Sequence, residues 1–152
     1  MGTRTRAAAT AAAVVITVSV CVGLSRAAQQ SGKTIRDGVF NAAQVERGTR
    51  VFDSVCGECH PKEDFGPLFM GGWTGATVDE LFVQVQGTMP YESPGALKDA
   101  EYLDVLTYIF SLNGAKPGDQ ALVAGSDALK EIRIDGPYEW KGEGEARLRS
   151  AR

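Results

Sequence analysis

The segment Cys56-Gly57-Glu58-Cys59-His60 constrains this chain more than any other feature, because it follows the pattern C-x-x-C-H. This pattern is the attachment site of a c-type haem. Positions i, i+3 and i+4 of a helix share one face, so both sulfurs can reach the two vinyl groups of one porphyrin. His60 then lies where its imidazole binds the iron from below. The sequence therefore predicts one covalently attached haem c.

Three other kinds of site also use paired cysteines. A thioredoxin-like redox pair expects a strand before the pair and a surrounding sheet, which this sequence does not suggest. A zinc site needs four ligands, whereas the chain has three cysteines and one histidine, and Cys21 lies in the N-terminal segment. A disulfide between neighbouring helical positions would restrain almost nothing. Haem attachment is the favoured interpretation.

Residues 1–27 have the composition of a signal peptide. They contain three arginines, no acidic residue and one uninterrupted uncharged run. Ser25 and Ala27 are the small residues that signal peptidase requires before its cut. The run is also close to the roughly 20 residues that span a bilayer, so an uncleaved membrane anchor is the main alternative. Thioether attachment takes place outside the cytoplasm, so we predict an exported, periplasmic protein.

The charge balance is acidic and local. Residues 1–27 hold three of the 16 lysines and arginines and none of the 19 acidic residues, so the remaining chain has a net charge near −6. From Asp53 to Asp104, ten acidic residues face only Lys62 and Lys98. Nucleic acid is excluded as a partner because phosphate binding needs a basic face. A protein partner with a basic surface fits this charge.

The first predicted helix runs from about Ala42 to Cys56. Asn41 precedes it and Gln44 follows three positions later, which is the arrangement of a capping box. Apolar and small residues then recur at helical spacing and form one face. The residues of this face are Val45, Gly48, Val51, Phe52 and Val55.

The second predicted helix covers residues 78–86. Thr77 and Glu80 form a second capping box, and Gly87 is the expected stop. The apolar stripe of this helix consists of Val78, Leu81, Phe82 and Val85.

The third predicted helix covers about residues 100–113, with Asp99 as its cap and Asn113-Gly114 as its end. Its apolar side consists of Tyr102, Val105, Leu106, Ile109 and Leu112. No strand pattern competes with these three helices. The predicted fold class is therefore all-α, with three main helices around the haem.

The chain divides into four parts on this basis. After the signal peptide, residues 28–40 form a linker and residues 41–114 form the haem domain. Residues 115–152 form an irregular, partly disordered C-terminal extension. Asp127–Ile132 is expected to form one or two helical turns. Three short helices provide a thin core, and such a domain needs a prosthetic group or another staple.

The histidines and methionines present in the chain indicate that the sixth iron ligand is a methionine. The chain has no second histidine, and Met1 is lost with the signal peptide, which leaves Met70 and Met89. Met89 lies just after the second helix, in a Pro-containing loop that can cover the opposite haem face. We predict Met89 as the ligand; Met70 and an open site are the alternatives, because methionine also fills core gaps.

With these motifs the sequence resembles the class I c-type cytochromes over about residues 42–114. The resemblance rests on Cys56-Gly57-Glu58-Cys59-His60, Gly66-Pro67-Leu68, Thr88-Met89-Pro90 and Asp104-Val105-Leu106-Thr107-Tyr108-Ile109. It implies a small cytochrome c fold. It also implies that the carbonyl of Pro67 accepts the second imidazole N–H of His60, which orients the ring.

The same resemblance implies that the first and last helices cross at Gly48 and Phe52 on one side and Val105 and Tyr108 on the other. Trp73 lies between the two ligand regions, and it either donates its indole N–H to a haem propionate or packs against the haem edge.

The stretch 88–114 looks like exported bacterial cytochromes that accept electrons from periplasmic dehydrogenases. We therefore expect an electron carrier rather than an enzyme. Its electron donor would be a dehydrogenase, and its electron acceptor an oxidase or another cytochrome. The protein would either diffuse between them or serve as the cytochrome subunit of the dehydrogenase. The alternative is a haem-based gas-binding or sensor module in which Met89 dissociates. A small peroxidase is disfavoured because no second histidine is present to assist the chemistry.

Overall fold

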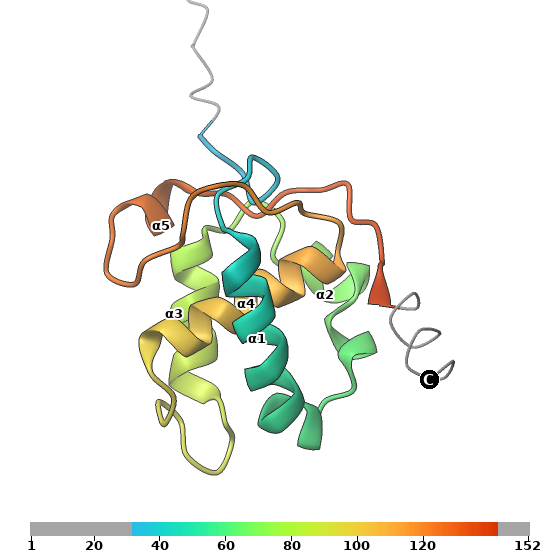
Figure 1. Cartoon of the computed structure of the whole chain (residues 1–152), viewed down its shortest axis with the longest axis vertical. Coiled ribbons are helices and arrows are strands. Elements are labelled where there is room, and N and C mark those ends of the chain that lie inside the picture. Colours follow the sequence, from blue (N-terminus) through green and yellow to red (C-terminus); the bar gives the residue numbers. More distant parts are fainter. Residues whose placement is uncertain (1–31, 143–152) are drawn as a thin grey trace, which may run out of the picture. The chain divides into compact units, whose positions relative to one another are not determined.

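The computed structural model describes residues 32–142. Its helices are α1 (Ala42–Ser54), α2 (Pro67–Gly72), α3 (Val78–Thr88), α4 (Asp99–Leu112) and α5 (Ala128–Glu131), with 3-10 turns η1 (Cys56–Glu58) and η2 (Lys62–Phe65). Figure 1 shows these helices joined by irregular segments. Within residues 32–142 the only β-type pairing consists of isolated bridges. The predicted all-α fold class is confirmed.

Helix α1 begins where the sequence predicts and ends two residues earlier, where the chain tightens into η1. The Asn41 side chain accepts a hydrogen bond from the Gln44 backbone N–H at 3.0 Å. The other half of the predicted capping box is absent, because the Gln44 side chain bonds the backbone of Leu122 instead. Its Nε2 donates to the Leu122 carbonyl at 3.1 Å, and its Oε1 accepts from the Leu122 N–H at 2.9 Å.

Helix α3 has the predicted capping box. The Thr77 backbone N–H donates to the Glu80 carboxylate at 2.6 Å, and the Glu80 N–H donates to the Thr77 hydroxyl at 3.1 Å. The helix runs two residues further than predicted, so Gly87 is helical rather than a stop. It ends before Met89, whose backbone is extended, as expected for a residue that precedes proline.

Helix α4 forms the centre of the core, and every residue from Tyr102 to Phe110 is buried. The prediction that Asp99 caps this helix was wrong. Lys98 holds the cap position, and its N–H donates to the Glu101 carboxylate at 2.8 Å. Asp99 lies in the first turn and accepts a hydrogen bond from the Gln86 side chain at 2.6 Å, which links the end of α3 to the start of α4.

Helices α1 and α4 make the most extensive helix contact in the described part of the chain, and they cross in Figure 1. The crossing is close at Gly48, where an added Cβ would meet the backbone of Asp104 and lie 3.1 Å from Tyr108 Cβ. The rings of Phe52 and Tyr108 pack 5.3 Å apart. Beside this contact, Arg47 binds the buried Asp104 carboxylate through two hydrogen bonds of 2.6 and 2.9 Å.

The apolar core extends on both sides of the domain predicted at residues 41–114. Ile35, Val39 and Phe40 are buried before it, and the buried residues after it are Ala115, Leu122, Leu129, Ile132 and Ile134. The two flanks also pair with each other. The Arg133 N–H donates to the Lys33 carbonyl at 2.8 Å, and the Ile35 N–H donates to the Arg133 carbonyl at 2.9 Å.

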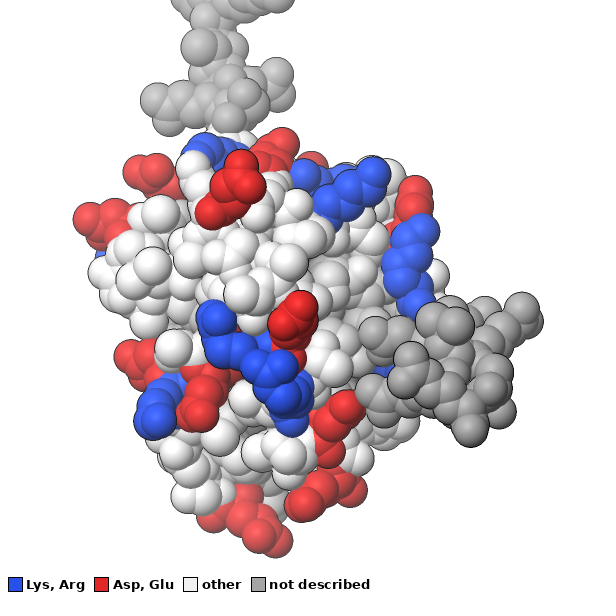
Figure 2. Space-filling view, in the orientation of Figure 1, with Lys and Arg blue, Asp and Glu red and all other residues white. Residues whose placement is uncertain are grey.

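The predicted signal peptide, residues 1–27, lies outside the described residues, as does the charged end from 143 to 152. Among the helices of the described part, none combines the length and the apolar character needed to cross a membrane. Figure 2 shows acidic side chains at the lower end of the described surface, where Figure 1 places η1 and the loop after α3.

Candidate haem-binding site

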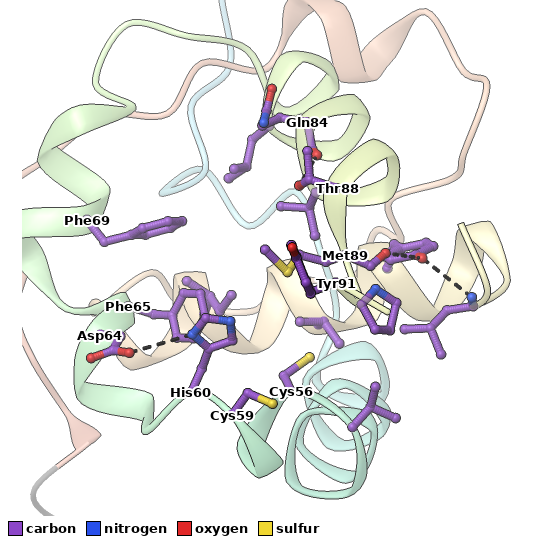
Figure 3. A pocket seen from close by; sticks show the side chains of 18 of the residues that line it. Cys56, Cys59, His60, Asp64, Phe65, Phe69, Gln84, Thr88, Met89 and Tyr91 are labelled. Carbon is purple, nitrogen blue, oxygen red and sulfur yellow. Dashed lines mark hydrogen bonds and ion pairs between the residues drawn. The ribbon is translucent and has the colours of Figure 1, made fainter. Parts of the chain in front are cut away.

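A cavity of about 390 Å³ opens beside η1, α3 and α4. Its lining is largely apolar, and the C-x-x-C-H residues Cys56, Cys59 and His60 all contribute to it. Figure 3 shows their side chains together on one wall. The apolar part of the lining comes mainly from Val55, Phe65, Phe69, Leu81, Val85, Leu97, Val105 and Ile109.

The wall that carries the cysteines is a tight turn and not a continued α-helix. The N–H groups of Cys59 and His60 both donate to the carbonyl of Cys56, at 3.2 and 2.9 Å. This turn brings the three side chains to one cavity, although the sequence predicted that a helix would do so. The two thiols are not joined to each other. Burial raises the pKa of the Cys56 thiol, so this group is protonated at neutral pH.

His60 is half-buried, and its Nδ1 lies 3.6 Å from a carboxylate oxygen of Asp64 (Figure 3). The imidazole also packs edge-on against Phe65, with ring centroids 5.7 Å apart. Asp64 follows His60 by four positions on η2, and it lines the cavity. The distance between Nδ1 and the Asp64 carboxylate is longer than a hydrogen bond, so Asp64 is a neighbour of the imidazole and not its hydrogen-bond partner.

Pro67 is the predicted site residue that the structure does not bring to the cavity. It is the exposed first residue of α2 and does not belong to the cavity lining. Asp64, which the sequence indicated only as surface charge, has a carboxylate oxygen 3.6 Å from Nδ1 of His60. Helical spacing could not have pointed to this neighbour, because Pro61 is extended and Asp64 lies on the 3-10 turn η2 that follows it.

The two candidate methionines have different surroundings. Met70 lies on α2, is fully buried in the apolar core and is not part of the cavity lining. Met89 follows α3 and lines the cavity. Figure 3 shows Met89 across the cavity from Cys56 and Cys59. The position of Met89 suits a second axial ligand, and the position of Met70 does not.

Three further aromatic residues lie at the cavity. Trp73 lines it and is partly buried. Tyr91 also lines it but is 86% exposed, so its ring stands at the rim. Tyr102, which the sequence indicated only as a core aromatic, is buried and lines the cavity as well. Its hydroxyl donates to the Met89 carbonyl at 2.7 Å.

These residues fit a covalently bound haem. The cavity lies within the size range of cofactor sites, is lined mostly by apolar side chains, and carries few polar groups. Two thiols, an imidazole and a thioether sulfur line this cavity, and these are the groups that would hold a haem c and its iron. Residues 32–142 contain no cluster of three or more His, Cys, Asp or Glu side chains arranged to hold a metal ion directly.

Comparison with known proteins gives one family match. Residues 43–109 match the family model described as cytochrome c oxidase, cbb3-type, subunit III. The matched segment contains the C-x-x-C-H motif, Met89 and most of α4. No curated protein and no solved structure matches the chain significantly.

Proposed function

We propose that this protein is a single-electron carrier with one covalently attached haem c, whose axial ligands are His60 and Met89. Residues 43–109 form a c-type cytochrome domain, which is an electron-transfer module rather than an enzyme. One observation carries the proposal. The C-x-x-C-H side chains and Met89 line the same apolar cavity from opposite sides.

Each residue has a defined task in this proposal. Cys56 and Cys59 hold the porphyrin through thioethers, so that it is not lost during turnover. A haem held by these residues would supply a ferric/ferrous iron couple, which carries one electron. The Met89 thioether favours the ferrous state and raises the reduction potential relative to a second imidazole. Apolar residues such as Leu81 and Ile109 exclude water from the iron.

We further propose an exported, periplasmic protein that takes electrons from a dehydrogenase, either as a diffusing carrier or as its cytochrome subunit, and delivers them to an oxidase or another cytochrome. The signal-like segment 1–27 and the haem motif support export. The partner surface would be basic. Support for this comes from Glu58, Glu63, Asp64 and Glu92, which are exposed near the cavity or its rim loop.

Substitution of the two methionines tests the ligand assignment. Met89→Ala should lower the reduction potential of the purified holoprotein and let carbon monoxide bind the ferrous iron rapidly. Met70→Leu is the matched control, because it conserves the volume of a buried side chain that lies outside the cavity lining. Potentiometry and carbon monoxide binding measure both effects.

Two outcomes would contradict the assignment. If Met70→Leu lowers the potential and Met89→Ala does not, Met70 is the ligand. If the unaltered reduced protein already binds carbon monoxide rapidly and fully, the site is that of a gas-binding or sensor module. The covalent link is tested separately by denaturing the protein in acidic organic solvent, since a thioether-bound haem stays with the polypeptide.

The electrostatic part of the proposal predicts a salt dependence. The rate of electron transfer to the natural partner should fall as ionic strength rises, because salt screens attraction between exposed charges. Stopped-flow measurements over a range of salt concentrations give this dependence. A rate that does not change with salt would remove the basic-partner assignment but would leave the haem ligation untouched.

A further inference from the structure

We propose that Tyr102 is a positioning residue, whose hydroxyl closes the loop that carries Met89 and so keeps the methionine sulfur at the iron. This inference rests on the proposed ligation by Met89. It assigns to Tyr102 a role beyond filling the core, which is the role its helical spacing suggested.

The loop between α3 and α4 is held together mainly from within. The Ser93 N–H donates to the Pro90 carbonyl, the Gly95 N–H to the Met89 carbonyl and the Ala96 N–H to the Ser93 carbonyl. Residues 91–96 are all exposed. These bonds shape the loop, but they do not attach it to the rest of the domain.

Tyr102 supplies such an attachment at both ends of the loop. Its hydroxyl donates to the Met89 carbonyl at 2.7 Å and accepts a hydrogen bond from the Leu97 N–H at 3.4 Å. One oxygen atom therefore connects the residue that opens the loop with a residue near its end. Figure 3 shows Met89 beside the dashed bonds of this connection.

The tyrosine itself is firmly placed. It lies in the first turn of α4, is 1% exposed, and packs edge-on against Phe82 of α3 with ring centroids 6.4 Å apart. The hydroxyl is therefore fixed by two packed helices, while the loop that it binds is exposed. A group held in this way biases the loop toward its closed position, in which Met89 faces the cavity.

Tyr102→Phe removes only the oxygen and keeps the ring that lines the cavity. The Met89 carbonyl and the Leu97 N–H then lose this partner when the loop is closed, whereas water satisfies both groups when the loop is open. The closed state should become less favourable by the value of one to two ordinary hydrogen bonds, which changes the open population by on the order of tenfold. Apparent affinity for a competing ligand rises by the same factor.

Imidazole titration of the ferric holoprotein measures the open population. We expect Tyr102→Phe to bind imidazole about tenfold more tightly than the unaltered protein and to show a lower reduction potential. Tyr108→Phe is the matched control, because it removes another buried hydroxyl from α4, on the side that faces Phe52. Urea unfolding of both variants separates a general loss of stability from an effect on the loop.

The outcomes separate this inference from the ligand assignment. If Met89→Ala binds imidazole more tightly but Tyr102→Phe behaves as the unaltered protein or as Tyr108→Phe does, the positioning role is wrong and Met89 ligation stands. If the unaltered protein binds imidazole as tightly as Met89→Ala, then Met89 is not the ligand and both proposals fail.

A second measurement needs no variant. If the hydroxyl holds the loop, the amide of Leu97 should exchange its hydrogen with solvent more slowly than the amide of Glu92, which lies in the exposed part of the same loop. Equal exchange rates in the holoprotein would overturn the inference even if Tyr102→Phe failed to fold.

Discussion

Replacing Gly48 by alanine should destabilise the domain, although alanine is the better helix former. A methyl group at this position would lie 2.5 Å from the carbonyl carbon of Asp104, closer still to its oxygen, and 3.1 Å from Tyr108 Cβ. Ordinary contact begins at 3.4 Å, so α1 and α4 must move apart by at least about 0.9 Å. The obstacle is backbone, which cannot swing aside as a side chain does.

The size of the effect follows from two opposing contributions. Overpacking of a closely packed contact costs up to about 3 kcal/mol. The change from glycine to alanine in a helix returns about 1 kcal/mol. Gly48→Ala should therefore lower the free energy of unfolding by about 2 kcal/mol.

Gly87→Ala provides a matched control. Gly87 is also helical, but nothing lies within 4 Å of an added Cβ there. This variant should gain about 0.5–1 kcal/mol. Urea unfolding of the holoproteins, followed by circular dichroism, should place the two midpoints on opposite sides of that of the unaltered protein. A Gly48→Ala variant as stable as the unaltered protein would refute the close crossing of α1 and α4.

Two further changes test other contacts. Arg47→Met leaves the buried Asp104 carboxylate without its partner and should lower the free energy of unfolding in urea by about 3 kcal/mol. This is the lower end of the range for breaking a buried ion pair, because Arg47 is half exposed. A loss below about 0.5 kcal/mol would identify the pair as a screened surface contact. Hydrogen bonds from the Thr77 backbone N–H and then its hydroxyl hold the pKa of Glu80 below its usual 4.5. The stabilisation from the charged carboxylate is therefore complete at pH values well above 4.5 and is lost as the pH falls through the lowered pKa. Glu80→Gln should therefore lower the free energy of unfolding more at neutral pH than at an acid pH below 4.5. An equal loss at both pH values would contradict this account.

The helices could be predicted well because their signals are local. Thr77 and Glu80 act on each other within one turn, so the residue pattern is sufficient to locate the start of α3. The Gln44 side chain is a contrary case. Its partner Leu122 lies 78 positions away, and no local pattern reports a contact of that range. The flanking segments join the core for the same reason: their buried side chains depend on contacts that only the folded chain brings together.

In the candidate site, too, some residues have a local sequence signal and others can be assigned only from the folded structure. Cys56, Cys59 and His60 are neighbours in the sequence, so their spacing alone indicates their chemistry. The sequence favoured Met89 over Met70 because of its place in the Pro-containing loop after the second helix. Burial adds that Met70 is a core side chain whereas Met89 lines the cavity. Helical spacing predicted that the ring of Tyr102 faces the core, but it does not report where the hydroxyl at the end of the side chain finds its partners.

The pairing between the two flanks has a practical consequence for trimming the gene. Arg133 bonds both Lys33 and Ile35 through its backbone, and Ile134 is fully buried. A fragment cut to the family match at residues 43–109 would leave the hydrophobic partners of these flanks open to water. The smallest version worth expressing therefore runs from Lys33 to at least Ile134.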